Sequence, residues 1–356
     1  METIQITDPR VQLVGRIATE NSATDGAHFY WPGSYARVAF TGTTLKVKAN
    51  VHVLWGSNSL GVVLDGRCSK IPVKVENNGK EMTIELANNL PAEEVHTCLL
   101  YKVLDCSYDY HLLAFETDGA FVAPSPLPQR RLEFYGDSVT AGQVLECVDY
   151  VGRTDPPSHD SCYDNAWYSY AWMTARKLEA QAHLTAQGGI AILDKTGYFH
   201  WPDVYGMEQT WDRLCYFPEA GTYTKWDFSK YIPDAVCFAI AQNDHHDAVR
   251  DVCDLTVSDP AHRTRWQEAY KTIIRGIASK YPAGTPFVLM TTVLMHNKEW
   301  DEAITEIKDS LCAEGLNVHQ FFFSRNGAAT PGHPRIPEQQ EMAEELAAYL
   351  KELLGW

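Results

Sequence analysis

Two hydrophobic patterns divide the chain. Over the first 120 residues or so, short apolar runs rich in β-branched residues alternate with turn residues, and no convincing helical period lies between them. Short strands at this spacing predict an all-β sandwich of the jelly-roll type. The runs are Arg37–Val53 (two strands around Thr41-Gly42-Thr43), Gly61–Gly66, Ile71–Glu76, Glu81–Ala87 and Thr97–Asp105.

A proline-rich segment separates this part from the rest. Pro124, Pro126 and Pro128 stand at alternate positions, a pattern that resists both a helix and a central strand. We therefore place a domain boundary here and predict domains at residues 1–128 and 129–356, with the chemistry confined to the second.

In the second part, short apolar runs alternate with segments of helical period, which predicts a mostly parallel, doubly wound sheet. The expected strands are Arg131–Gly136, Ala182–Gln187, Ala235–Ala241, Pro286–Val293 and Asn317–Phe323. The expected helices run over Asn165–Leu178, from Pro260 to about Lys280, and from about Pro337 to the end. Ligands of such sheets bind at the carboxyl ends of the strands.

Polar and small residues follow four of these strands. The first ends in Gly136-Asp137-Ser138, and a lone Asp-Ser pair is most simply a helix cap. However, Gly188-Gly189, Asn243-Asp244 and His333 follow later strands. A nucleophile, hydrogen-bond donors and a histidine at one edge of a sheet are the parts that acyl transfer requires.

These blocks resemble those of the SGNH (GDSL) hydrolases. Along nearly the whole chain the sequence is similar to carbohydrate esterase family 2, in the RxxEFxGDSxTxG segment from Arg130 to Gly142, the NAWYSYAWMTARKL segment and the WDFSK-x-x-PD stretch from Trp226 to Asp234. The resemblance implies a jelly-roll domain followed by an α/β SGNH-hydrolase domain, three-layered with a parallel five-stranded flavodoxin-like sheet. Members of the family deacetylate plant polysaccharides such as xylan and glucomannan.

The resemblance also implies roles for single residues. Ser138 would be the nucleophile and His333 its base. The oxyanion hole would consist of the Ser138 N–H, an N–H of Gly188 or Gly189, and the Asn243 amide, each donor contributing about 3 kcal/mol.

Two positions depart from the family pattern. Ala241 stands where a glycine is usual, a change we expect to be tolerated at negative φ. The acid that usually precedes the histidine is replaced by Thr330 and Pro331. Two alternatives stay open for the group that orients the imidazole: a backbone carbonyl near Thr330 to Gly332, which would give a Ser–His dyad, or an acid from elsewhere in the chain.

The segment from Tyr198 to Tyr231 is unusually aromatic. Most of its rings are expected to pack, and Trp201 is the favoured substrate contact, with Asp244 as a second candidate. The aromatic residues are Tyr198, Phe199, Trp201, Tyr205, Trp211, Tyr216, Phe217, Tyr223, Trp226, Phe228 and Tyr231.

Composition mainly excludes partners. A net charge of −16 argues against nucleic acid and anionic membranes. The nine cysteines form no C-x-x-C pair and are expected to be reduced. The adjacent His245 and His246 have no further metal-ligating residues at a suitable spacing, so we expect no metal and no cofactor.

The N-terminus lacks a signal-peptide pattern, which predicts a cytoplasmic protein, or a secreted one if a leader was removed. The aromatic content is compatible with a homo-oligomer.

Three functions remain open at this stage. The first is a serine esterase that removes acetyl groups from a carbohydrate, the second an SGNH esterase or thioesterase on another acyl substrate, and the third a non-catalytic carbohydrate-binding protein. An intact set of Ser138, Asn243 and His333 favours catalysis, and the lack of a strongly apolar insert argues against a lipid substrate.

Overall fold

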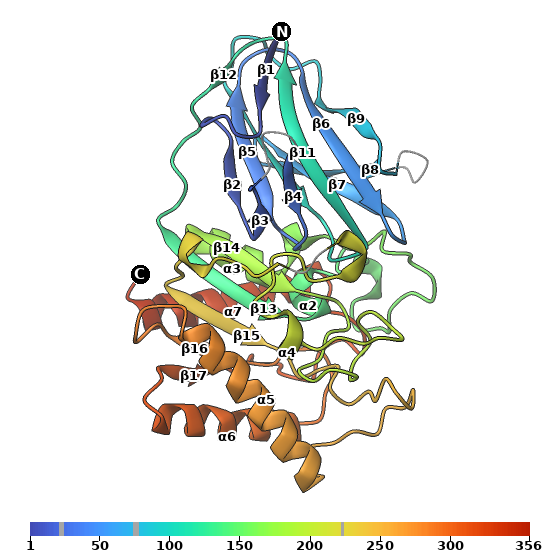
Figure 1. Ribbon diagram of the computed structural model, residues 1–356, viewed down its shortest axis with the longest axis vertical. Coiled ribbons are helices and arrows are strands. Elements are labelled where there is room, and N and C mark those ends of the chain that lie inside the picture. Colours follow the sequence, from blue (N-terminus) through green and yellow to red (C-terminus); the bar gives the residue numbers. More distant parts are fainter. Residues whose placement is uncertain (21–24, 74–77, 222–223) are drawn as a thin grey trace.

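The computed structural model describes residues 1–20, 25–73, 78–221 and 224–356, and places a β-sandwich on top of an α/β domain (Figure 1). Parts of two predicted features, the end of the run Ile71–Glu76 and Tyr223, lie outside the described residues. Among the residues described, no helix is long and apolar enough to cross a membrane. All nine cysteines are unpaired.

The sandwich consists of two antiparallel sheets, as the sequence predicts. Strand β6 alternates buried and half-buried residues along its length, so one face packs into the core while the other faces outward. The first sheet has the order β3-β4-β11-β6-β9 with β1 beside β11, and the second has the order β12-β5-β10-β7-β8 with β2 beside β5. Their bounds are β1 Glu2–Gln5, β2 Gln12–Val14, β3 Ile17–Ala18, β4 Ala27–Phe29, β5 Tyr35–Phe40, β6 Leu45–Val53, β7 Asn58–Leu64, β8 Arg67–Val73, β9 Glu81–Ala87, β10 His96–Lys102, β11 Tyr108–Thr117 and β12 Phe121–Val122.

The second domain contains a parallel sheet in the order β14-β13-β15-β16-β17. Numbered along this domain the order is 2-1-3-4-5, the flavodoxin-like arrangement expected from the resemblance. The strands are β13 Arg130–Gly136, β14 Ala180–Ala186, β15 Ala235–Ala239, β16 Phe287–Leu289 and β17 Val318–Gln320. The last sandwich strand ends at Val122 and β13 begins at Arg130, so the boundary predicted at residue 128 falls in the connection between them.

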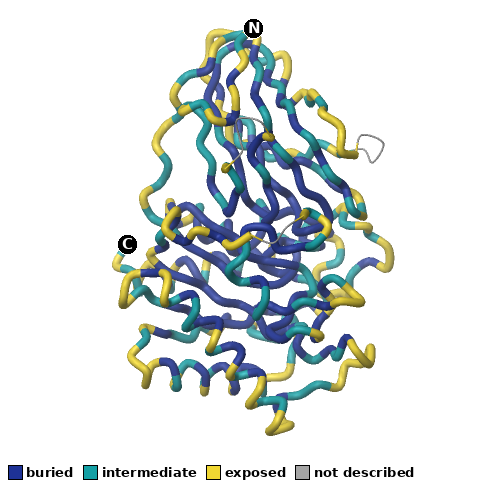
Figure 2. Tube along the Cα trace, viewed as in Figure 1, coloured by how far each residue is buried: buried dark blue, intermediate teal, exposed yellow. Residues whose placement is uncertain are grey.

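Helices cover both faces of this sheet, which explains why a central strand such as β15 is apolar throughout. On β13, Phe134 packs in one cluster with residues of α3 (Tyr170–Lys177) and α7 (Ile336–Leu354). Its neighbour Tyr135 packs in another with α5 (Pro260–Ala278) and α6 (Glu299–Ala313). The buried residues form a continuous column through the middle of the molecule (Figure 2). Two further short helices are α2 (Ser138–Ala141) and α4 (Met207–Thr210).

One predicted helix is divided in the structure. The segment Asn165–Leu178 forms a 3₁₀ turn over Ala166–Tyr168 and then α3, because Ser169 adopts an extended conformation and its side chain accepts a hydrogen bond from the Ala171 N–H. The helix predicted from Pro260 is confirmed as α5, with Asp259 as its cap.

The two domains are joined by buried polar contacts. Arg16, from the sandwich, is fully buried and donates to the Glu133 carboxylate at 3.0 Å and the Tyr135 hydroxyl at 2.5 Å, both on β13. Trp31 stacks on Tyr216 of the second domain with ring centroids 3.7 Å apart. The sandwich is therefore fixed to the sheet that supports the candidate site.

We expect Arg16→Ala to lower the free energy of unfolding by about 3–5 kcal/mol, because it leaves the Glu133 carboxylate buried without its cationic partner. Urea unfolding at neutral pH measures this. The control is Arg10→Ala, which removes ion pairs of a partly exposed arginine with Glu2 and Asp8 and should cost at most about 1 kcal/mol. Equal losses in the two variants would contradict the importance of the buried pair.

Candidate active site

Ser138 is the first residue of α2, directly after β13. Asp137 caps this helix by accepting from the Val139 N–H at 3.0 Å, and burial raises the pKa of Asp137 to about 6. Gly136 is needed in the turn, since a Cβ there would lie 2.0 Å from Thr140 Oγ1. As the first residue of the helix, Ser138 has an N–H without an intrahelical acceptor.

His333 pairs with a carboxylate that the sequence analysis did not identify. Its ring Nδ1 lies 2.6 Å from Asp155 Oδ2, and its backbone N–H donates to Asp155 Oδ1 at 2.9 Å. Gly332 permits this approach, because a Cβ there would lie 2.4 Å from Asp155 Oδ1. Of the two alternatives that the sequence leaves open, a backbone carbonyl or an acid from elsewhere in the chain, the structure contains the acid.

The Asp155–His333 pair is supported by a buried arginine. Arg335 is fully buried and donates to Asp155 Oδ1 at 2.8 Å and to the carbonyl oxygen of His333. Glu338 accepts from the Arg335 N–H at 2.9 Å and the Thr330 hydroxyl at 2.6 Å, which fixes the loop on the end of α7. Thr330 in turn accepts from the Gly152 N–H at 3.0 Å, three residues before Asp155.

These contacts keep Asp155 ionised. Half-burial acts to raise the pKa of Asp155, but the hydrogen bonds from the His333 ring and backbone and from Arg335 outweigh it and hold that pKa well below its usual range. A carboxylate at Nδ1 leaves Nε2 as the basic nitrogen of the imidazole.

Of the two candidate glycines, only one has a free N–H. The Gly188 N–H donates to Asp105 Oδ2 at 2.9 Å, whereas the Gly189 N–H has no acceptor among the described residues. Asn243 donates one of its two amide hydrogens to the Ile190 carbonyl at 3.0 Å, which leaves the other available. The geometry thus favours Gly189 over Gly188 as an oxyanion donor.

Asp105 belongs to the sandwich domain, so the first domain supports the candidate site although the predicted catalytic residues all lie in the second. Besides Gly188, its Oδ2 accepts from Gln143 at 2.7 Å and from Gln187 at 3.1 Å. Burial raises the pKa of Asp105, and the Gly188 N–H opposes that rise. Asp105 therefore anchors the Gly188-Gly189 turn.

We expect Asp105→Asn to lower kcat for an acetyl ester by about 10- to 100-fold with little change in KM, because an amide cannot accept all three hydrogen bonds and the Gly189 N–H shifts. Steady-state kinetics on 4-nitrophenyl acetate measure both constants. Asp65→Asn is the control, since Asp65 is an exposed sandwich carboxylate bonded to His96 and should leave kcat within about twofold. A wild-type kcat in Asp105→Asn would refute this anchoring role.

A cavity of about 410 Å³ brings the predicted residues together. Ser138, His333, Gly188, Gly189 and Asn243 all line it. The rest of its wall comes from both domains: Trp55, Asp105, Gln143, Ser161, Gln187, Tyr198, Phe199 and His200.

The two candidate substrate contacts do not line this cavity. Trp201 follows the cavity residue His200 in the chain and is 64% exposed. Its role as a substrate contact stays a prediction. Asp244 is buried, where it accepts from the Ile192 N–H at 2.8 Å and the Trp266 indole at 2.7 Å. Burial raises the pKa of Asp244 to about 7. Asp244 thus has a supporting position rather than a surface for substrate.

The aromatic segment mostly packs, as expected. Its buried members are Phe199, Tyr216, Phe217, Trp226, Phe228 and Tyr231. Tyr198 lines the cavity and is 46% exposed. Trp55, which also lines the cavity, comes from the sandwich and is 49% exposed.

The Ala241 backbone has φ of 159° rather than the negative value expected.

Comparison with known proteins finds similar sequences. The family model described as "Carbohydrate esterase 2 N-terminal" matches residues 13–126. The cellulase/esterase CelE of Acetivibrio thermocellus is 29% identical over 98% of this chain, which spans 40% of the length of that relative. The acetylxylan esterase / glucomannan deacetylase of Cellvibrio japonicus is 24% identical over 99% of this chain and 92% of its own.

A solved structure agrees with both domains. A family two carbohydrate esterase from Clostridium thermocellum, in complex with cellohexaose, superposes with a TM-score of 0.77 and 26% identity. The match covers 97% of this chain and 99% of that one, so the sandwich and the α/β domain are shared as one unit.

Proposed function

We propose that the chain, which is similar to carbohydrate esterases of family 2 over both domains, is a serine esterase that removes O-acetyl groups from plant polysaccharides or oligosaccharides of the xylan or glucomannan type. The observation that carries the proposal is the cavity that joins Ser138 to the Asp155–His333 pair. An acetylxylan esterase / glucomannan deacetylase among the relatives supports the substrate class.

In the first step, Nε2 of His333 takes the Ser138 hydroxyl proton while Oγ attacks the acetyl carbonyl carbon. Asp155 holds the imidazole through Nδ1 and stabilises the imidazolium that forms. The N–H groups of Ser138 and Gly189 and the Asn243 amide donate to the developing oxyanion. Collapse of the tetrahedral intermediate passes the proton to the departing sugar oxygen and leaves Ser138 acetylated.

In the second step, water repeats the attack on the acetyl-enzyme. His333 takes a proton from the water, the same donors bind the second oxyanion, and acetate leaves as Ser138 recovers its proton. Each step uses only residues that line the cavity or contact His333, so the reaction requires no cofactor.

The walls of the cavity suit a sugar. Trp55 and Tyr198 are large, half-exposed rings on opposite domains, and such rings offer an apolar face with a polar tip. A pyranose presents both apolar C–H faces and hydroxyls, which matches this surface. A relative's structure with cellohexaose supports a carbohydrate ligand.

A substrate panel tests the proposal. Acetylated xylan, acetylated glucomannan, 4-nitrophenyl acetate and long-chain 4-nitrophenyl esters are compared by kcat/KM, with acetate release measured for the polysaccharides. The acetylated substrates should be turned over and the long-chain esters at least about tenfold less efficiently, since the residues that line the cavity include no aliphatic side chain to contact a long acyl chain. A preference for long chains would favour another acyl substrate, and binding without any turnover would favour a carbohydrate-binding protein.

A further inference from the structure

A group of imidazoles and carboxylates lies on the outer face of the sandwich, outside the candidate active site. We call Asp25, His28, His52, Asp109 and His111 the sandwich histidine cluster. In the sheet register, His111 on β11 is opposite His28 on β4, and Asp109 on β11 is opposite His52 on β6. Directly opposed residues point to the same face, so three neighbouring strands contribute to one polar patch.

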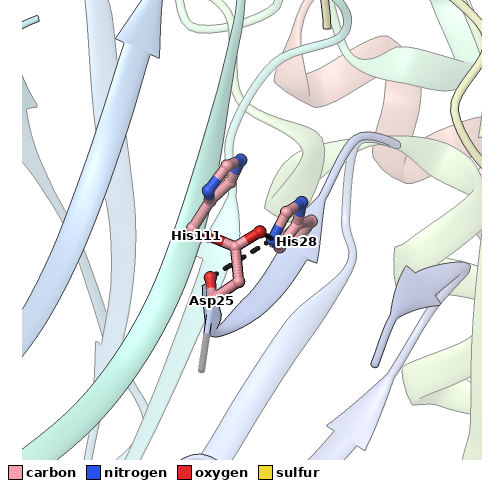
Figure 3. A group of neighbouring side chains, drawn as sticks. All are labelled: Asp25, His28 and His111. Carbon is pink, nitrogen blue, oxygen red and sulfur yellow. Dashed lines mark hydrogen bonds and ion pairs between the residues drawn. The ribbon is translucent and has the colours of Figure 1, made fainter. Parts of the chain in front are cut away.

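Three members have the spacing of metal ligands (Figure 3). Asp25, His28 and His111 each offer one ligand atom, and these atoms all lie within 4.8 Å of one another. The Nε2 of His28 is 3.1 Å from Asp25 Oδ2, and the rings of His28 and His111 stack with centroids 3.5 Å apart. Two ligand atoms on a tetrahedral zinc ion, each about 2.0–2.1 Å from it, are about 3.3 Å apart, so the spacing of the ligand atoms is close to what zinc requires. The stacked rings of His28 and His111 must turn out of their parallel arrangement for both to direct a nitrogen lone pair at one ion.

A second trio, His52, Asp109 and His111, is less suitable. The Nδ1 of His52 is 2.7 Å from Asp109 Oδ1, a direct hydrogen bond that is too short to have an ion between its atoms. Asp109 Oδ1 also lies 3.7 Å from His111 Nε2. The Asp109–His52 pair is therefore placed to orient His111 rather than to bind an ion itself.

Other contacts also prepare the first trio. The Tyr30 hydroxyl lies 3.1 Å from Nδ1 of His28, and Nε2 of His28 lies 3.2 Å from the Asp25 carbonyl oxygen. An ion bound at Nε2 would replace the contact with this carbonyl, while the Tyr30 hydroxyl would remain the partner of Nδ1. Asn50 is opposite His111 on β6, and its Oδ1 is buried without a hydrogen-bond partner among the described residues. The Asp25 side chain is 59% exposed, so an ion can enter from solvent.

We propose that Asp25, His28 and His111 bind one divalent transition-metal ion of the zinc class, with water or Asn50 Oδ1 completing the coordination. Two imidazoles, a carboxylate and a further oxygen form a donor set that zinc accepts in four-coordinate sites. The expectation of no metal came from linear spacing, and these ligands are separated by up to 86 positions between Asp25 and His111.

The site would stabilise the protein rather than take part in ester hydrolysis. It ties the chain at Asp25 to β4 and β11. Through Tyr30, whose ring contacts Phe217 edge-on at 6.1 Å, it also reaches the junction with the second domain. Metal binding to the folded protein alone raises the unfolding midpoint.

Calorimetric titration of the chelator-treated full chain with Zn²⁺ tests the proposal. We expect one equivalent bound with Kd of about 1 μM or below, and a rise of several degrees in Tm on adding Zn²⁺. His28→Ala and His111→Ala should weaken binding at least about 100-fold, and Asp25→Ala, which changes an exposed side chain that is tolerant of substitution, at least about tenfold.

The controls separate this site from adventitious binding and from the esterase. His319→Ala changes a histidine of the other domain, bonded to Asn317, and should bind Zn²⁺ as the wild type does. Chelator should leave esterase activity unchanged, so the result does not depend on the proposed function. No saturable binding, wild-type binding in both His28→Ala and His111→Ala, or a loss in His52→Ala greater than in Asp25→Ala would overturn the assignment.

Discussion

Ser138→Ala should lower kcat/KM for 4-nitrophenyl acetate by at least about 10⁴-fold, because it removes the hydroxyl that we propose forms the acetyl-enzyme and leaves the proposed oxyanion donors in place. His333→Ala should have a similar effect, since the serine then has no base. The two losses should not add in the double variant, because nucleophile and base act as one unit. Initial rates over a range of substrate concentrations measure all three.

Ser258→Ala is the matched control, since Ser258 is exposed, bonds to Glu299 and is not among the residues that line the cavity. It should retain activity within about twofold. Rapid mixing followed by mass spectrometry should detect one acetyl group on the wild type and none on Ser138→Ala. Activity of either Ser138→Ala or His333→Ala within tenfold of wild type would refute the assignment.

Asp155→Asn should lower kcat/KM by about 10³- to 10⁴-fold. An amide can donate to Nδ1 and so favour the wrong tautomer of His333, and it carries no charge to stabilise the imidazolium. The acidic limb of the pH–rate profile should also move to lower pH, because an imidazolium without its carboxylate is less stable. A residue with a purely structural role would leave that limb in place.

The matched control is Asp160→Asn, on the same segment, whose carboxylate accepts from the Ser57 hydroxyl at 2.8 Å on the surface. It should leave both kcat/KM and the pH profile unchanged. Since the folded-state pKa of Asp155 is depressed, its pairing stabilises the folded protein above about pH 4, and that contribution is lost as the pH falls further. An unshifted profile together with a loss below tenfold would show that Asp155 is dispensable.

The sequence predicts the parallel sheet well because its strands are buried on both faces. Runs such as that of β15 are apolar throughout, and the residues that follow them reach the same edge of the sheet. That is why Ser138, Asn243 and His333 could be grouped before their positions were known. Helix α6 was not predicted, although Trp300, Ile304 and Ile307 repeat three or four apart, so the signal was present.

Asp155 and Asp105 could not be found in the same way. Asp155 precedes Pro156 in an irregular segment 178 residues before His333, and no periodic pattern marks it. Asp105 follows a sandwich strand of the other domain, where the hydrophobic pattern indicates only an end of β-structure. Both are paired through tertiary packing, which linear spacing does not encode.

The hydrogen bond from Gly188 to Asp105 bears on how this protein can be divided or recombined. The linker with its alternate prolines is an obvious place to cut, as if an accessory module preceded an enzyme. Cutting there removes Asp105, which accepts a hydrogen bond from the Gly188 N–H, and the other sandwich residues that line the cavity. It also removes Arg16, the partner of the buried Glu133 carboxylate. The sandwich and the α/β domain therefore depend on each other structurally, and fusions to other modules should join at the two ends of this pair rather than at the linker.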